Sequence, residues 1–404
     1  MPSYQDNLDL SLCCTSEAAA EAYRHGVDAY LHAWPGVRDA AQEAVQYDPE
    51  FALAHALRAL DAAVYLRRAD VGPAIELAQR HAPQASEREQ SHVAAIALLV
   101  GGKSALAFDA ALAHMARWPT DALLASTLLG AFGLFAFSGR DDHDAARLAF
   151  MRRLAPHFPA DHAWMLSHLG WTCIEAGELD EGMAHAERSL GLRRANGNIA
   201  HIVMHGLFER DDAAAGLAFI DAWLPDYPED ALLWGHLQWH AALTELALGR
   251  IDAALARFTA QVLRRLDVAP PLVGMSDAAS MLWRLHLLGR QGLPWSAAAA
   301  YCERYFPNGG NVFAELHLAM LAAGRGDRSG LNASTVRLRA TAEKGHAAAP
   351  VALHWNAALG ALMVGDTAAA KNELRACRAE SVRLGGSHAQ RTVVDLTQAW
   401  IEAA

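Results

Sequence analysis

Residues 169–186 read LGWTCIEAGELDEGMAHA, and this stretch decides the fold class. Small and large apolar side chains recur at helical spacing on both sides of Gly177, which is the signature of two amphipathic helices. Glycine tolerates the left-handed backbone angles with which many helices end, so Gly177 marks a tight turn between them. The stretch therefore predicts a helical hairpin.

The same pattern returns further along the chain. Two more hairpins turn at Gly249 and Gly365, and a degenerate one turns at Asp211-Asp212. The distance from Gly177 to Gly249 is about two periods of the roughly 34-residue tetratricopeptide unit. A single hairpin cannot bury its apolar stripe, whereas stacked hairpins bury it between them. We therefore predict an all-α fold, a tetratricopeptide-type helical-hairpin repeat superhelix (α-solenoid).

Composition and chain breaks agree with a single array. Hydrophobic residues make up 53% of the chain, and much of this is alanine, the best helix former. Helix-breaking residues are local, and none of them lies in a linker long or polar enough to separate domains. The largest expected interruption is a loop at residues 267–276. The sequence thus predicts one continuous superhelix over residues 1–404.

Charge and hydropathy exclude several partners. The formal net charge is −11. The chain lacks the basic stripe that binding to a nucleic acid requires. No apolar run reaches the roughly 18 residues of a membrane span, and the amino terminus, MPSYQDNLDLSLCC, does not resemble a secretory signal. Of the five cysteines, Cys13 and Cys14 suggest no chemistry, and the other three are expected to be buried. We expect a cytoplasmic protein.

Histidines concentrate in residues 198–320. His201 and His205, and then His236 and His240, are spaced i,i+4, so each pair shares one helix face. Counted back from the turns that follow, both pairs fall on the first helix of a hairpin. We expect residues 198–320 to form a polar pocket in which the histidines converge.

These residues also carry a family resemblance. The chain resembles the tetratricopeptide repeat protein 38 family over most of its length, fading at both ends. The resemblance rests on four ordered helix motifs: Ala200-His201 with His205, His236 with Trp239-His240, Asp277 to Ser280 with Leu282-Trp283-Arg284, and Phe313 with Leu316-His317. It implies the repeat architecture, with first helices lining a concave surface. Family members often carry an acidic residue where this chain has Phe208, and Glu209 is expected to point elsewhere on the helix.

Chemistry suggests roles for these side chains. Imidazole titrates near neutral pH, so His205, His240 and His317 are candidate proton carriers, and Asp277 would orient one of them. Arg284 could anchor an anionic group. The remaining candidates would contact the substrate: His201, His236, Trp239 and Trp283. The two HxxxH pairs could also supply zinc ligands, but the HExxH pattern is absent, and no metal or cofactor is assigned.

Three interpretations of the histidines stay open. In the first, the pocket binds a small molecule, with or without a metal, and catalyses acid–base chemistry such as hydrolysis or elimination. In the second, the concave groove binds a peptide or partner protein. In the third, the cluster is a satisfied structural core. Seven scattered histidines are expected to be surface or packing residues: His25, His55, His81, His92, His114, His185 and His354. His162 and His168 lie close together in the sequence and form a weak extra candidate.

Overall fold

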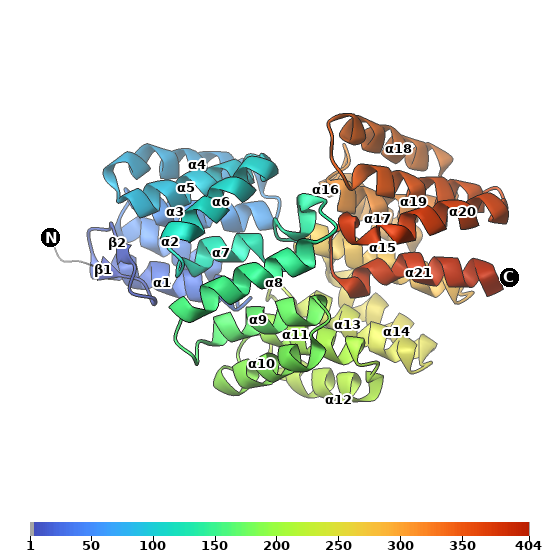
Figure 1. Ribbon diagram of the computed structural model, residues 1–404, viewed down its shortest axis with the longest axis horizontal. Coiled ribbons are helices and arrows are strands. Elements are labelled where there is room, and N and C mark those ends of the chain that lie inside the picture. The colour runs from blue at the N-terminus through green and yellow to red at the C-terminus, as the bar shows by residue number, and fades with distance from the viewer. Residues whose placement is uncertain (1–3, 404) are drawn as a thin grey trace. The chain divides into compact units, whose positions relative to one another are not determined.

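The computed structural model describes residues 4–403, and these residues form an all-α fold of helices packed in series (Figure 1). The predicted all-α helical-repeat class is therefore confirmed. The contacts within the chain define two compact units. Unit 1 comprises the described residues up to Phe135, Ala146–Val203 and Pro225–Trp234, and unit 2 comprises Ala136–Ala145, Met204–Leu224 and the described residues from Gly235 onward.

The helices of unit 1 follow a short antiparallel hairpin of β1 (Tyr4–Gln5) and β2 (Ser11–Leu12), whose two-residue strands are too short for a sequence period to reveal. The helices are α1 (Glu17–Leu31), α2 (Val37–Tyr47), α3 (Ala52–Val64), α4 (Arg68–His81), α5 (Glu87–Val100), α6 (Ser104–Arg117), α7 (Ala122–Leu128), α9 (Ala163–Glu175) and α10 (Leu179–Leu192). Helices α8 (His143–Leu154) and α11 (Gly197–Glu209) have residues in both units.

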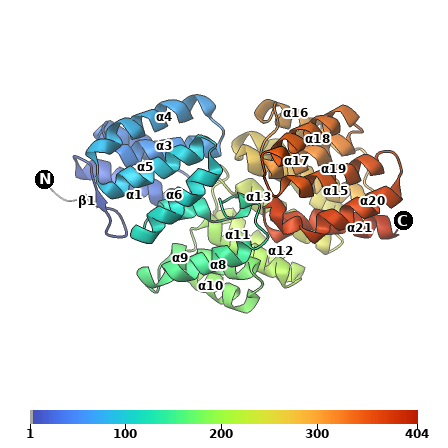
Figure 2. The same ribbon diagram turned by 45° about the horizontal axis from the view of Figure 1, so that its top comes forward.

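The helices of unit 2 are α12 (Ala213–Trp223), α13 (Trp234–Ala247, with Trp234 in unit 1), α14 (Ile251–Arg257), α15 (Pro271–Leu287), α16 (Trp295–Tyr305), α17 (Val312–Gly324), α18 (Arg328–Glu343), α19 (Ala349–Leu362), α20 (Thr367–Ala379) and α21 (His388–Ala403). Consecutive helices pack on one another, as α17 does on α18, and α19 on α20. Figures 1 and 2 both show α19 and α20 side by side. In the described part of the chain, no helix combines the length and the apolar character needed to cross a membrane.

The predicted turns lie where the sequence places them. Gly177, Gly249 and Gly365 adopt φ angles of 85°, 72° and 79°, a region that disfavours residues with a side chain. The degenerate hairpin also turns as predicted, because Asp211 has a φ of 55° and the side chain of Asp212 caps α12. These turns fix where each helix pair begins and ends.

Each unit has its own apolar core. In unit 1 the core joins α1, α3, α5 and α7, and it includes Phe51, Leu57 and Trp164. In unit 2 the core joins α13, α15, α17, α19 and α21. Cys173, Cys302 and Cys377 are buried, as predicted. The single superhelix predicted over residues 1–404 concerns both units together and stays a prediction, and residues 1–3 and 404 lie outside the described residues.

The loop expected at residues 267–276 is wrong. Helix α15 begins at Pro271, so residues 271–276 of that stretch are helical. Proline fits the first position of a helix, where its missing N–H would have no partner in any case. Before it, α14 continues as a π-helix at Phe258–Val262 and a 3₁₀ helix at Leu263–Val268. The two prolines thus start a helix instead of extending a loop.

Close approach of α9 and α10 depends on two glycines. A Cβ atom at Gly182 would lie 2.7 Å from Ile174 Cγ1 and 2.9 Å from the carbonyl oxygen of Gly170. The carbonyl belongs to the helix backbone and cannot move aside cheaply. Small residues at this crossing therefore set the distance between the two helices.

We predict that Gly182→Ala lowers the free energy of unfolding by about 1–3 kcal/mol, because the added methyl overpacks the crossing. Gly191→Ala is the matched control, since Gly191 is exposed on the same helix with no atom near its Cβ position. Alanine at that position should stabilise the protein by roughly 0.5–1 kcal/mol. Urea unfolding of both variants measures the effect, and equal stabilities for the two variants would contradict it.

Candidate functional site

Three histidine rings converge in unit 2. His240, on α13, lies between the other two: its ring centroid is 4.6 Å from that of His205 on α11 and 4.8 Å from that of His236 on α13. One ring nitrogen of each lies within 4.8 Å of the others. All three side chains are buried. The rings therefore meet as the HxxxH spacing predicts, while their chemical roles stay predictions.

Asp277, on α15, fixes the orientation of one of these rings. Both carboxylate oxygens lie 2.9 Å from His236 Nδ1, so a single N–H is shared between them. A carboxylate can only accept here, so Nδ1 carries the proton and Nε2 presents its lone pair. Burial raises the pKa of Asp277, and His236 opposes that shift. We expected Asp277 to orient His205, His240 or His317, and its partner is instead His236.

Trp239 forms the apolar wall of the cluster. Its ring stacks on His236 at 5.3 Å with an angle of 10°, and meets His240 edge-on at 5.0 Å. The guanidinium of Arg284 lies 5.6 Å from its centroid. The predicted contact of Trp239 with a substrate stays a prediction, since the observed neighbours are side chains of the protein itself.

Arg284 and Trp283 bind the carboxyl-terminal helix. Arg284 Nη2 donates to the carbonyl of Ala389 at 2.7 Å and to Thr392 Oγ1 at 3.0 Å, and burial lowers its pKa to about 9. Trp283 Nε1 donates to Thr397 Oγ1 at 2.8 Å. These hydrogen bonds hold α21 on α15. They support a structural role for both residues over the predicted contacts with substrate.

His317, on α17, is bonded within its own helix. Its Nδ1–H donates to the carbonyl of Phe313 at 2.8 Å, and its ring lies 4.4 Å from that of Phe313. Its Nε2 has no hydrogen-bond partner among the described residues. Burial lowers the pKa of His317 to about 4, so the ring is neutral at pH 7. A neutral ring cannot donate a proton as a general acid, which weakens the predicted role.

Three further residues of α11 were singled out from the sequence, and each has contacts of its own. His201 belongs to the part of α11 in unit 1, where it is half-buried and stacks on Trp171 with centroids 5.7 Å apart. Phe208 is 37% exposed. Glu209 accepts a hydrogen bond from His388 Nδ1 at 2.8 Å.

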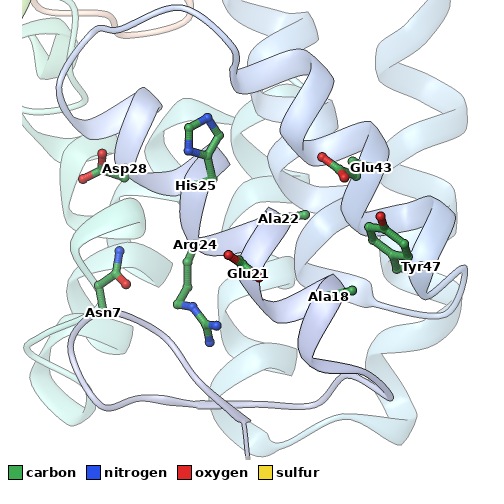
Figure 3. Close-up of a pocket in the computed structure, with 9 residues that line it drawn as sticks. All are labelled: Asn7, Ala18, Glu21, Ala22, Arg24, His25, Asp28, Glu43 and Tyr47. Atoms are coloured by element: carbon green, nitrogen blue, oxygen red, sulfur yellow. The ribbon is translucent and has the colours of Figure 1, made fainter.

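Two hollows are described, and His205, His236 and His240 line neither. One, of about 590 Å³, lies in unit 1 between α1, α2 and the amino-terminal loop, with Arg24, Glu21 and Glu43 on its walls (Figure 3). The other, of about 530 Å³, lies between α18 and α19. These three rings are buried and in contact with one another. Such a site suits a ligand as small as a single ion better than an organic substrate.

A second group of buried polar residues was not predicted from the sequence. His92 and His114, which we predicted to be surface or packing residues, are buried, and both contact Asp121 in unit 1. They lie on successive helices, and Asp121 caps a third. No local spacing signals this group, because the packing of three helices brings its members together.

No protein-family model matches the chain. The resemblance to the tetratricopeptide repeat protein 38 family therefore stays an expectation drawn from the four motifs.

We predict a pH dependence of stability from His317. The unfolded chain takes up the proton near pH 6.5, whereas the folded chain takes it up only near pH 4, so acidification favours unfolding between these values. From pH 7.5 to pH 5, the free energy of unfolding should fall by about 2 kcal/mol more in the wild type than in His317→Gln. Urea unfolding at both pH values measures this, and parallel losses in the two proteins would exclude it.

Proposed function

We propose that this chain is a tetratricopeptide repeat protein 38-like repeat protein that binds a divalent transition-metal ion through His205, His236 and His240. The observation that carries the proposal is the contact of Asp277 with His236 Nδ1. Histidine ligands of metals usually donate their other N–H to a carboxylate, which fixes the tautomer and makes the ligand nitrogen more basic. A buried carboxylate in this position is what a metal ligand requires.

The geometry of the three rings supports the same conclusion. Zinc–nitrogen bonds of about 2.0–2.1 Å place neighbouring ligand atoms roughly 3.3 Å apart in a tetrahedron. The nearest ring nitrogens lie within 4.8 Å of one another, so small rotations of the rings bring them to this separation. Three imidazoles are the number of protein ligands in many catalytic zinc sites, where water or a ligand oxygen takes the fourth position.

The proposal changes the roles of His205 and His240. As metal ligands they stay neutral and do not carry protons themselves. The acid–base chemistry expected from the sequence would then pass to water on the ion, whose pKa zinc lowers to about 7. A small molecule with an oxygen donor at the fourth position, and its hydrolysis, remain the proposed substrate class and reaction.

Burial separates this proposal from the two alternatives. His205, His236 and His240 are at most 6% exposed, so a peptide lying in an open groove would not contact them. Binding of a peptide or partner protein would have to use other residues. A purely structural core remains the sharper competitor, because the same burial suits a packed polar network. Metal content decides between them.

We predict that full-length untagged protein, purified without chelators, loses about one equivalent of zinc, iron or manganese when His240 is replaced by glutamine. His286→Gln is the control, because His286 is half-buried in unit 2 and has no part in the cluster. Elemental analysis by mass spectrometry measures the metal, and circular dichroism shows that each variant folds. A folded His240→Gln protein with the metal content of the wild type would overturn the proposal.

Asp277→Asn tests the orienting contact separately. The amide keeps the shape of the carboxylate but loses its charge, so zinc affinity should fall about 10- to 100-fold. Competition with a chromophoric chelator, using Zn²⁺ and the metal-depleted protein, measures the dissociation constant. An unchanged constant would mean that Asp277 serves packing alone.

A further inference from the structure

The second group of buried polar residues lies in unit 1, on three consecutive helices. His92 is on α5, His114 is on α6, and Asp121 caps the amino terminus of α7. The three side chains are at most 3% exposed. One ligand atom of each lies within 4.8 Å of the others. The packing of these helices thus brings two imidazoles and a carboxylate together out of contact with solvent.

One oxygen of Asp121 receives more contacts than it has lone pairs. Asp121 Oδ2 lies 2.8 Å from Arg88 Nη1, 3.0 Å from His92 Nδ1 and 3.2 Å from His114 Nε2. A carboxylate oxygen offers two lone pairs, so three N–H donors cannot all be served well. The other oxygen, Oδ1, accepts from the backbone N–H of Leu124 at 3.3 Å. Hydrogen bonds alone therefore give a poor account of this convergence.

The charges around Arg88 are also unequal. Asp121 and Glu89 are buried beside it, and Asp6 interacts electrostatically with both Arg88 and Asp121. Three carboxyl groups thus face one guanidinium, and burial raises the pKa of Glu89 and of the half-buried Asp6. Buried charges without compensation are costly, so either protons or one divalent cation must balance them.

Two buried atoms at this place have no hydrogen-bond partner among the described residues. They are Nε2 of His92 and Oε2 of Glu89. Glu89 Oε1, in contrast, accepts from the backbone N–H of Cys13 at 2.8 Å. This hydrogen bond holds the segment after β2 against the cluster. Arg88 Nη2 also donates a hydrogen bond to the carbonyl of Ser11 at 2.8 Å. The hydrogen bonding around Asp121 is therefore incomplete among the described residues.

We infer that His92, His114 and Asp121 form a second metal site, which takes a divalent first-row transition-metal ion. It lies in unit 1 and is separate from the site of the proposed function. The ion would accept the lone pairs of His92 Nδ1, His114 Nε2 and Asp121 Oδ2, and Arg88 would keep the other lone pair of that oxygen. Two histidines and one carboxylate are a common ligand set for zinc and non-haem iron.

The distances agree with a ligand shell. Bonds of about 2.1 Å place adjacent ligand atoms roughly 3.0 to 3.4 Å apart, depending on octahedral or tetrahedral geometry. The two nitrogen–oxygen distances of 3.0 and 3.2 Å fall in this range. With Nε2 of His114 on the ion, its Nδ1 carries the proton and donates to Ser91 Oγ at 3.0 Å. That contact supplies the outer hydrogen bond that ligating histidines usually make.

The test separates this site from the one in unit 2. In full-length protein carrying His236→Gln and His240→Gln, about one equivalent of metal should remain, and adding His114→Gln or Asp121→Asn should remove it. His55→Gln is the control, since His55 is buried in unit 1 and bonds to the carbonyl of Pro49. Elemental analysis gives the metal content, and circular dichroism shows that the variants fold.

A second measurement avoids dependence on the ion that the host supplies. Metal-depleted protein with the two unit 2 substitutions should gain thermal stability on addition of Zn²⁺ alone, and the gain should disappear with His114→Gln. Single substitutions distinguish failure of this site from failure of the unit 2 site. If only the unit 1 site exists, His114→Gln alone removes the metal from the protein, and His240→Gln alone does not. Absence of metal in the doubly substituted chain, together with an unchanged melting temperature in Zn²⁺, would overturn the inference. In that case, protons and hydrogen bonds balance the buried negative charge of the carboxylates.

Discussion

Asp277 places the strongest constraint on unit 2, because a carboxylate that is 1% exposed must be balanced by its neighbours. His236 supplies a shared N–H from α13, and Arg284 supplies positive charge from the same helix, α15. Arg284 in turn binds the first turn of α21 through Ala389 and Thr392. One buried charge therefore links α13, α15 and α21. Removing one partner of such a buried pair commonly lowers the free energy of unfolding by about 3–5 kcal/mol. The carboxylate, its histidine and the arginine therefore depend on one another.

The two clusters use the same elements in different balance. In unit 2 the carboxylate of Asp277 lies behind a histidine, so the rings converge on one another and the acid acts as an outer partner. In unit 1 the carboxylate of Asp121 lies between His92 and His114, and both rings contact one oxygen. The first arrangement offers three imidazoles, and the second offers two imidazoles and a carboxylate. They would therefore differ in charge and in preferred metal. Repeat folds allow this, because each group of helices builds its own core.

Much of the fold could be predicted from the sequence, because the signals are local. Gly177, Gly249 and Gly365 mark turns, and Asp211-Asp212 marks the degenerate one. The i,i+4 spacing also placed the α11 and α13 histidines on common faces. What the sequence could not show depends on contacts between helices. The rings of His205, His236 and His240 are buried against one another, Asp277 contacts His236, and Arg284 and Trp283 bind α21. The group at Asp121 was invisible for the same reason, since its members come from three helices. The loop predicted at residues 267–276 was wrong because proline both breaks and begins helices, and Pro271 begins one.

X-ray absorption at the zinc edge tests the central claim most directly. The sample is full-length protein with Asp121→Asn, which removes the unit 1 site, loaded with one equivalent of Zn²⁺. Three histidine ligands predict a first shell of nitrogen and oxygen at about 2.0–2.1 Å, together with the outer-shell scattering of imidazole rings. The imidazole signal should fall when His240→Gln is added. A spectrum of hydrated zinc without imidazole scattering, or one that His240→Gln leaves unchanged, would contradict a metal site at the convergence of His205, His236 and His240.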